Sequence, residues 1–191
     1  MRACDNPFNV DRVSAIRYRP LGTTFESILD RLAAMEYRAA IVGYEGAGKT
    51  TLLEDLQKVL EDEGKRTRMI LVNDSALLDR KARRQLFAQL EGDEIVLLDG
   101  ADAIGYAAWL SLKRRILSQA VGLVITTHRP GRLPTLIHCT TTPELLADIV
   151  RDLLPQTGGD EALHRLYDRH QGNIRNCLRT LYDRCACDRV S

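Results

Sequence analysis

Short apolar runs alternate with stretches of helical spacing through the middle of the chain. The runs that predict strands cover residues 39–42, 69–72, 95–98, 123–125 and 136–139. The run 95–98 is continuously apolar, as expected of a parallel strand covered by helices on both faces. Between the runs, apolar residues three and four positions apart predict helices over 49–63 and near 105–120. This alternation predicts a three-layer α/β/α fold with a mainly parallel sheet of about five strands.

Capping patterns mark two further helix starts. The sequence Thr23-Thr24-Phe25-Glu26 places a threonine three residues before a glutamate, ahead of a helical apolar pattern that includes Leu32. Thr141-Thr142-Pro143-Glu144 repeats this logic after the last predicted strand, with proline in the first helical turn. From there only helices are predicted, near 143–154, 160–170 and 173–185.

The predicted elements divide the chain into three parts. We expect an irregular N-terminal arm at 1–20, an α/β domain at 21–140, and a small all-α unit at 141–191. The chain has 191 residues, which is enough to bury a core without disulfides or a structural metal.

Charge and hydropathy narrow the class of protein. There are 27 Lys and Arg against 26 Asp and Glu, so the formal charge is +1, which does not favour nucleic acid as the default partner. The longest uncharged stretch near the middle, 116–127, falls short of the ~20 apolar residues that cross a membrane. The N-terminus carries no apolar signal segment, so we expect a cytoplasmic protein that does not enter membranes.

A phosphate-binding motif follows the first predicted strand. Residues 43–50 fit G-x-x-x-x-G-K-[ST] and open a predicted helix, which is the context that supports the motif. Its backbone N–H groups and the helix N-terminus would hold phosphates, Lys49 would bridge the β- and γ-phosphates, and Thr50 would bind Mg²⁺. The residues expected to contact nucleotide, with ATP and Mg²⁺ as cofactors, are Gly43, Tyr44, Glu45, Gly46, Ala47, Gly48, Lys49, Thr50 and Thr51.

A carboxylate is expected opposite this loop. Asp99 ends the third predicted strand, so it is our second candidate ligand of Mg²⁺ beside Thr50. In this position Leu97-Leu98-Asp99 resembles the second Walker motif of P-loop NTPases.

The order of motifs resembles one class of these proteins. A helix, a strand and another helix separate the two motifs, which is similar to the additional-strand class that includes the AAA+ ATPases. Gly172-Asn173-Ile174-Arg175 resembles the AAA+ lid motif G-[DN]-x-R, which implies a C-terminal helical lid whose Arg175 reaches the γ-phosphate. The resemblance also gives Thr126 or Thr127, with His128 as an alternative, the role of holding the attacking water.

Three departures from the AAA+ pattern modify the expected activity. Gly100 stands where a water-polarising glutamate is usual, leaving Asp102 as the candidate substitute, two residues further on. Only residues 128–134 join the fourth and fifth strands, so Arg129 or Arg132 would have to serve as an arginine finger from a neighbouring copy. The lid is also short. We therefore expect slow ATP hydrolysis or a nucleotide-gated switch, with lid movement regulating a protein partner.

Two alternatives stay open. The same loop occurs in small-molecule kinases. In a kinase, the side chains at 73–74 and those of Arg80, Arg83 and Arg84 would bind the substrate. A DNA-associated or protein-associated helper would use basic clusters such as 66–68 and 113–115, although no platform of aromatic residues for stacking on bases is apparent.

Overall fold

A single parallel sheet forms the centre of the molecule. The computed structural model describes residues 6–72, 90–155 and 159–187. Its strands are β1 (Arg38–Gly43), β2 (Arg66–Leu71), β3 (Glu94–Asp99), β4 (Gly122–Thr127) and β5 (Thr135–Cys139). They lie in the order β2-β3-β4-β1-β5, and every neighbouring pair is parallel. The five predicted strands and the α/β fold class are confirmed.

The strand order fixes where the candidate chemistry meets. β4 lies between β1 and β3, so one strand separates the phosphate-loop strand from the strand that ends at Asp99. In the register, Val42 pairs with Thr127 and Leu98 pairs with Ile125. The carboxyl ends of these three strands therefore share one edge of the sheet, where ligands of parallel α/β sheets bind.

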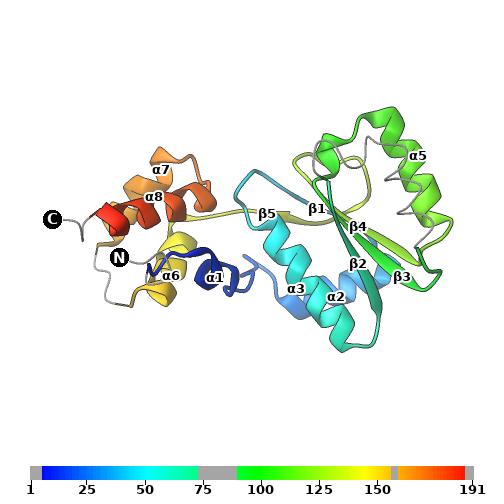
Figure 1. Ribbon diagram of the computed structural model, residues 1–191, viewed down its shortest axis with the longest axis horizontal. Coiled ribbons are helices and arrows are strands. Elements are labelled where there is room, and N and C mark those ends of the chain that lie inside the picture. The colour runs from blue at the N-terminus through cyan, green and yellow to red at the C-terminus, as the bar shows by residue number, and fades with distance from the viewer. Residues whose placement is uncertain (1–5, 73–89, 156–158, 188–191) are drawn as a thin grey trace.

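Helices cover both faces of the sheet (Figure 1). Helices α2 (Phe25–Ala34) and α3 (Lys49–Asp62) pack on the face that carries Ala39 and Ile41. Helix α5 (Tyr106–Leu117) packs on the opposite face, against Ala40 and Val42. Because successive strand residues point to opposite faces, a strand buried on both sides has to be apolar throughout.

Helix starts follow the capping rules with one shift of register. Thr24, not Thr23, caps α2, since its side-chain oxygen accepts the backbone N–H of Ser27 at 3.2 Å. The predicted pairing of Thr23 with Glu26 is therefore wrong by one residue. At α6 (Pro143–Leu153) the cap is again the second threonine of the pair, Thr142 and not Thr141, and it accepts the backbone N–H of Leu145 at 3.1 Å.

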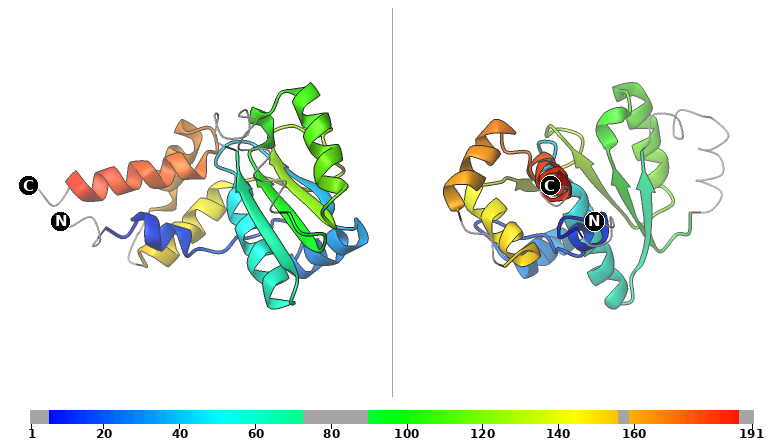
Figure 2. Two further views of the ribbon diagram at one scale, coloured as in Figure 1. Left: turned by 45° about the vertical axis from the view of Figure 1, so that its right-hand side comes forward. Right: turned by 60° about the vertical axis from the view of Figure 1, so that its left-hand side comes forward.

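The three C-terminal helices form a separate core. Helices α6, α7 (Asp160–Arg169) and α8 (Ile174–Cys187), here called the lid helices, bury Leu146, Val150 and Cys177 among themselves. Phe8, from the segment expected to be an irregular arm, is buried in the same core. That segment contains a short helix, α1 (Val10–Ser14), and Figure 2 shows it lying along the lid helices with both chain ends on that side.

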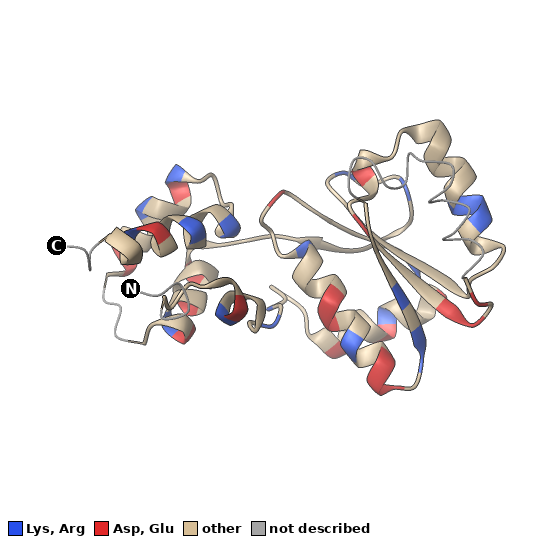
Figure 3. Cartoon of the chain, viewed as in Figure 1, with Lys and Arg blue, Asp and Glu red and all other residues tan. Residues whose placement is uncertain are grey.

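Charges are spread over the whole molecule. Figure 3 shows acidic and basic positions interspersed on the lid helices and on the sheet domain alike. Within the described ranges, no helix has the length and apolar character needed to cross a membrane. The kinase candidates at 73–74, Arg80, Arg83 and Arg84 lie outside these ranges.

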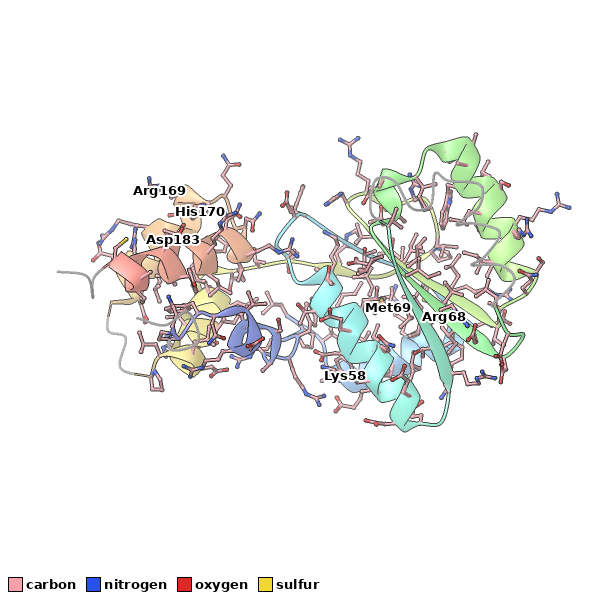
Figure 4. All side chains as sticks on the ribbon, viewed as in Figure 1. Lys58, Arg68, Met69, Arg169, His170 and Asp183 are labelled. Atoms are coloured by element: carbon pink, nitrogen blue, oxygen red, sulfur yellow. The ribbon has the colours of Figure 1, made fainter. Side chains whose placement is uncertain are left out.

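A buried ion pair joins the first residues of β3 to β2. Arg68, labelled in Figure 4, donates from Nε and Nη2 to the two carboxylate oxygens of Glu94 at 2.9 and 2.8 Å. The Glu94 side chain is only 6% exposed, and its hydrogen bonds from Arg68 hold its pKa below the usual value of 4.5.

We expect Glu94→Gln to lower the free energy of unfolding by about 1.5–3 kcal/mol at neutral pH, the range for hydrogen bonds to a charged group. Since folding lowers the pKa of Glu94, its contribution is complete above pH 4.5 and is lost as the pH falls through the folded value. The free energies of unfolding of the wild type and of Glu94→Gln, measured with urea, should therefore become equal at acidic pH. Glu91→Gln, whose side chain is 54% exposed, is the control and should change stability much less. An equal deficit of Glu94→Gln at all pH values would contradict the expectation.

Candidate functional site

The phosphate loop connects β1 to α3 with its backbone turned inward. Gly46 and Gly48 have φ angles of +75° and +81°, in the left-handed region that other residues rarely adopt. Helix α3 begins at Lys49, and its N-cap residue, Gly48, has no side chain with which to cap the first backbone N–H groups. Free N–H groups at a helix N-terminus attract anions, so the loop has the local geometry of a phosphate site.

Lys49 is folded back on this loop. Its Nζ donates to the carbonyl oxygens of Gly43 and Tyr44, both at 2.8 Å. Burial lowers the pKa of Lys49, and the positive charge of Arg175 adds to this, while the carboxylates of Asp99 and Asp102 act in the opposite sense. The fold therefore brings three of the predicted charged residues, Asp99, Asp102 and Arg175, within electrostatic range of Lys49.

Asp99 faces the first turn of α3. The Thr50 hydroxyl donates to Asp99 Oδ2 at 2.9 Å, and Thr126 donates to the other carboxylate oxygen. The backbone N–H of Gly100 in turn donates to Thr126 Oγ1 at 2.8 Å, which fixes this threonine. A hydroxyl and a carboxylate side by side fit Mg²⁺, which takes one or two protein ligands together with phosphate oxygens and water. Within the described residues, no cluster of three or more His, Cys, Asp or Glu offers a metal site.

Asp102 lies at the same edge of the sheet. It belongs to a 3₁₀ turn, η2 (Ala101–Ala103), that begins after Gly100 at a φ of +84°. Its carboxylate accepts from the Thr127 hydroxyl at 2.7 Å and from the backbone N–H of His128 at 2.6 Å, and His128 Nδ1 lies 3.0 Å away. The turn therefore places Asp102 directly against the end of β4, despite its sequence distance from Asp99.

A cavity of about 550 Å³ opens beside the phosphate loop. Its wall combines the loop, the N-terminal segment and the lid helices. Of the predicted site residues, Gly46, Ala47, Gly48, Thr50, Thr51 and Arg175 line this cavity. Tyr44 and Glu45 are instead exposed on the outer side of the loop, Tyr44 by 85%.

The lid helices touch the loop directly. A Cβ atom built at Gly46 would lie 2.0 Å from Oδ1 of Asn173, which also caps α8 by accepting the backbone N–H of Asn176 at 3.0 Å. Arg175 follows in the first turn of α8 and is exposed toward the cavity. Among the residues that the structure describes, no carboxylate pairs with it, so its guanidinium is available to a phosphate.

The two candidate arginine fingers differ in accessibility. The guanidinium of Arg132 stacks over the ring of Trp109 at 5.4 Å and donates from Nη2 to the Ile104 carbonyl at 2.7 Å. Arg129 is exposed on the loop that joins β4 to β5 without a helix. The contacts of Arg132 tie it to its own chain, whereas Arg129 is accessible from outside.

Sequence reasoning gave no role in supporting the loop to Tyr18, Asp55 or Cys139, and it named Asn173 only as part of the lid motif. One signal was present, because Asp55 lies three residues after Leu52 and thus on the apolar face of α3. It is 4% exposed and accepts the backbone N–H of Tyr18 at 2.7 Å. A buried carboxylate of this kind needs a donor from elsewhere in the fold.

Neither protein-family models nor curated proteins match the sequence. Solved structures of RuvB from Thermotoga maritima are similar in fold. One point mutant aligns over 83% of this chain and 61% of its own, at 18% identity and a TM-score of 0.59. RuvB described as a Holliday junction branch migration motor aligns over 83% and 60%, at 17% identity and a TM-score of 0.53. The match thus spans about three fifths of the RuvB chain. The sheet order, the phosphate loop and the C-terminal helices together show that this chain shares the P-loop α/β fold of the RuvB structures.

Proposed function

We propose that the chain binds ATP with Mg²⁺ and hydrolyses it in the cavity between the phosphate loop and the lid helices. The observation that carries the proposal is the 2.9 Å hydrogen bond from Thr50 to Asp99. It joins the end of the phosphate loop to the carboxylate after β3, the pairing that P-loop ATPases use for the metal ion. A glycine turn that only links a strand to a helix would require neither residue.

Binding would use groups that are free or easily released. The N–H groups of Gly46 to Thr51 would hold the phosphates, and Lys49 would exchange its two loop carbonyls for β- and γ-phosphate oxygens. Arg175 would reach the γ-phosphate from the lid. Thr50 and Asp99 would hold Mg²⁺, which when bound supplies positive charge beside the β- and γ-phosphates.

Hydrolysis needs a water aligned with the γ-phosphorus. Asp102 and Thr127 lie at the edge where that water would stand, 2.7 Å from one another. The water oxygen would attack the γ-phosphorus while Asp102 accepts a proton from that water. The bond between the γ-phosphorus and the bridging oxygen would break, giving ADP and phosphate. Asp102 stands two residues beyond the usual position of the glutamate and is held there by its bonds from Thr127 and His128, so we expect slow turnover.

Nucleotide state would be passed to the lid. Asn173 packs on Gly46, so a shift of the loop around phosphate displaces the start of α8. We propose that this movement regulates a protein partner in the cytoplasm. RuvB is a branch migration motor on Holliday junctions, and a DNA-associated role is the second candidate here. The near-zero net charge gives that role less support than a protein partner.

Product analysis tests the proposed reaction. The purified chain with Mg²⁺ and ATP labelled in the γ-phosphate should release one inorganic phosphate for each ADP formed, without any added acceptor. Nucleosides and small alcohols should not become labelled when offered in excess. A labelled acceptor that replaces free phosphate would overturn hydrolysis in favour of a kinase, and an absence of ATP binding would overturn both.

A further inference from the structure

Tyr18, in the N-terminal segment, contacts the phosphate-binding region in three ways. Its backbone N–H donates to Oδ2 of Asp55 in α3 at 2.7 Å. Its ring lies against Gly48, where an added Cβ atom would be 3.2 Å from both Cδ2 and Cε2. Its side chain also packs against the buried cluster that contains Cys139, at the end of β5. The three partners belong to α3, to the phosphate loop and to β5.

These partners support the loop at both ends. Gly48 is the residue from which α3 starts, and the ring of Tyr18 lies directly on it. At the other end, a Cβ atom built at Gly43 would lie 2.7 Å from the carbonyl oxygen of Cys139 and 2.9 Å from its Cβ. Tyr18 therefore touches the end of the loop directly and its beginning through Cys139.

Tyr18 itself is firmly held. Asp55 is 4% exposed, and a buried carboxylate without a donor is costly, so its bond to the Tyr18 N–H fixes the backbone here. Burial, reinforced by the Cys139 thiol, raises the pKa of Tyr18 well above its usual value, which keeps the hydroxyl protonated. On the lid side, Arg19 forms an ion pair with Asp152 of α6. The segment is thus anchored to both the sheet domain and the lid.

We propose that Tyr18 is a positioning residue that holds the phosphate loop in its anion-binding conformation before nucleotide arrives. This rests on the proposed function, because it concerns the same loop. A loop that is already ordered loses less conformational entropy when it binds, so its affinity for phosphate is higher. This role differs from that of a residue that lines a pocket for the nucleotide base. Such a residue would affect binding through the base and not through the phosphates.

Inorganic tripolyphosphate separates the two roles, because it has no base. We expect Tyr18→Leu to lower the affinity for tripolyphosphate and the affinity for ATP by the same factor, on the order of tenfold for the loss of one ordering contact. Calorimetric titration of the protein with each ligand, in the presence of Mg²⁺, measures both affinities. Tyr18→Phe keeps the ring on Gly48 and loses only the hydroxyl, so it should weaken both ligands by a smaller common factor. Tyr106→Leu, at a tyrosine that is 69% exposed at the start of α5, is the matched control and should bind as wild type does.

The outcomes are distinguishable. Weakened ATP binding with unchanged tripolyphosphate binding, in either Tyr18 variant, would assign Tyr18 to the base pocket and overturn the inference. Unchanged binding of both ligands by both variants would overturn it as well, while leaving the proposed function intact. A wild-type chain that binds neither ligand would overturn the proposed function itself. Thermal unfolding establishes that each variant is folded, and the isosteric Tyr18→Phe preserves the test where Tyr18→Leu does not fold.

Discussion

Replacing Lys49 with alanine is expected to lower ATP turnover on the order of 10²–10³-fold, the loss typical for one group that stabilises transition-state charge. Lys49 is the only lysine in the loop, and its Nζ already sits among the groups that would surround the phosphates. Lys49 is half-buried, and this burial lowers its pKa; charge acts more strongly in such a site than in water. Steady-state phosphate release by the wild type and the variant measures the effect.

Lys58→Ala is the matched control for this experiment. Lys58, labelled in Figure 4, lies on the same helix about two and a half turns after Lys49, so it projects from the opposite side of α3. It is exposed, and its removal should leave turnover unchanged. Equal turnover in wild type and Lys49→Ala would exclude the phosphate loop as the place of hydrolysis and point to a contaminating ATPase.

The strands were predictable because of where they lie. A parallel strand with helices on both faces has no solvent-facing positions, so Ile95 to Leu98 must be apolar without interruption, and all four are at most 2% exposed. β2 is the least buried strand, and its predicted range of 69–72 misses its first three residues, Arg66 to Arg68. Those residues are polar, and their pairing with β3 is not visible in a hydropathy pattern.

Local sequence patterns also fail to locate helix ends and short helices that depend on tertiary contacts. Either Thr23 or Thr24 could cap α2 as far as the sequence shows. The backbone angles of the folded chain decide between them, and a local sequence pattern does not reveal those angles. Helix α1 is too short to show a helical period, and it is held by the burial of Phe8 beside it.

The candidate site also has a part that the sequence predicts and a part that only the structure shows. The phosphate loop is contiguous, so its glycines, Lys49 and Thr50 were found as one motif with a physical purpose. The supports of that loop come from far along the chain: Tyr18 precedes it, and Cys139 and Asn173 follow in other elements. Such contacts depend on the order of strands and on where the lid helices pack. The resemblance to AAA+ ATPases supplied Arg175, whereas the packing of Asn173 on Gly46 required the structure.

Asp102→Asn is expected to lower the rate of ATP hydrolysis by about 10²–10⁴-fold, the usual contribution of a general base, with ATP affinity nearly unchanged. The reason is geometric. Gly100 offers no side chain, and the 3₁₀ turn brings Asp102 to Thr127 at 2.7 Å, so in the proposed mechanism this carboxylate takes the role of the water-polarising group. Asparagine keeps the size of the side chain and cannot accept the proton of the water. Single-turnover hydrolysis with excess protein, combined with calorimetric binding of ATP, separates the chemical step from affinity.

Asp93→Asn is the control for Asp102→Asn, because Asp93 lies before β3 at the opposite edge of the sheet with its side chain 63% exposed. It should hydrolyse ATP as wild type does. If Asp102→Asn retained the wild-type single-turnover rate, another group would have to accept the proton, and Asp102 would serve only to hold the loop after β4 through Thr127 and His128. If the variant instead lost ATP affinity and rate in equal measure, its carboxylate would act in the bound ground state, as a ligand of the nucleotide complex and not as a base. Only a fall in rate at constant affinity matches a proton acceptor, because proton transfer begins after ATP is bound.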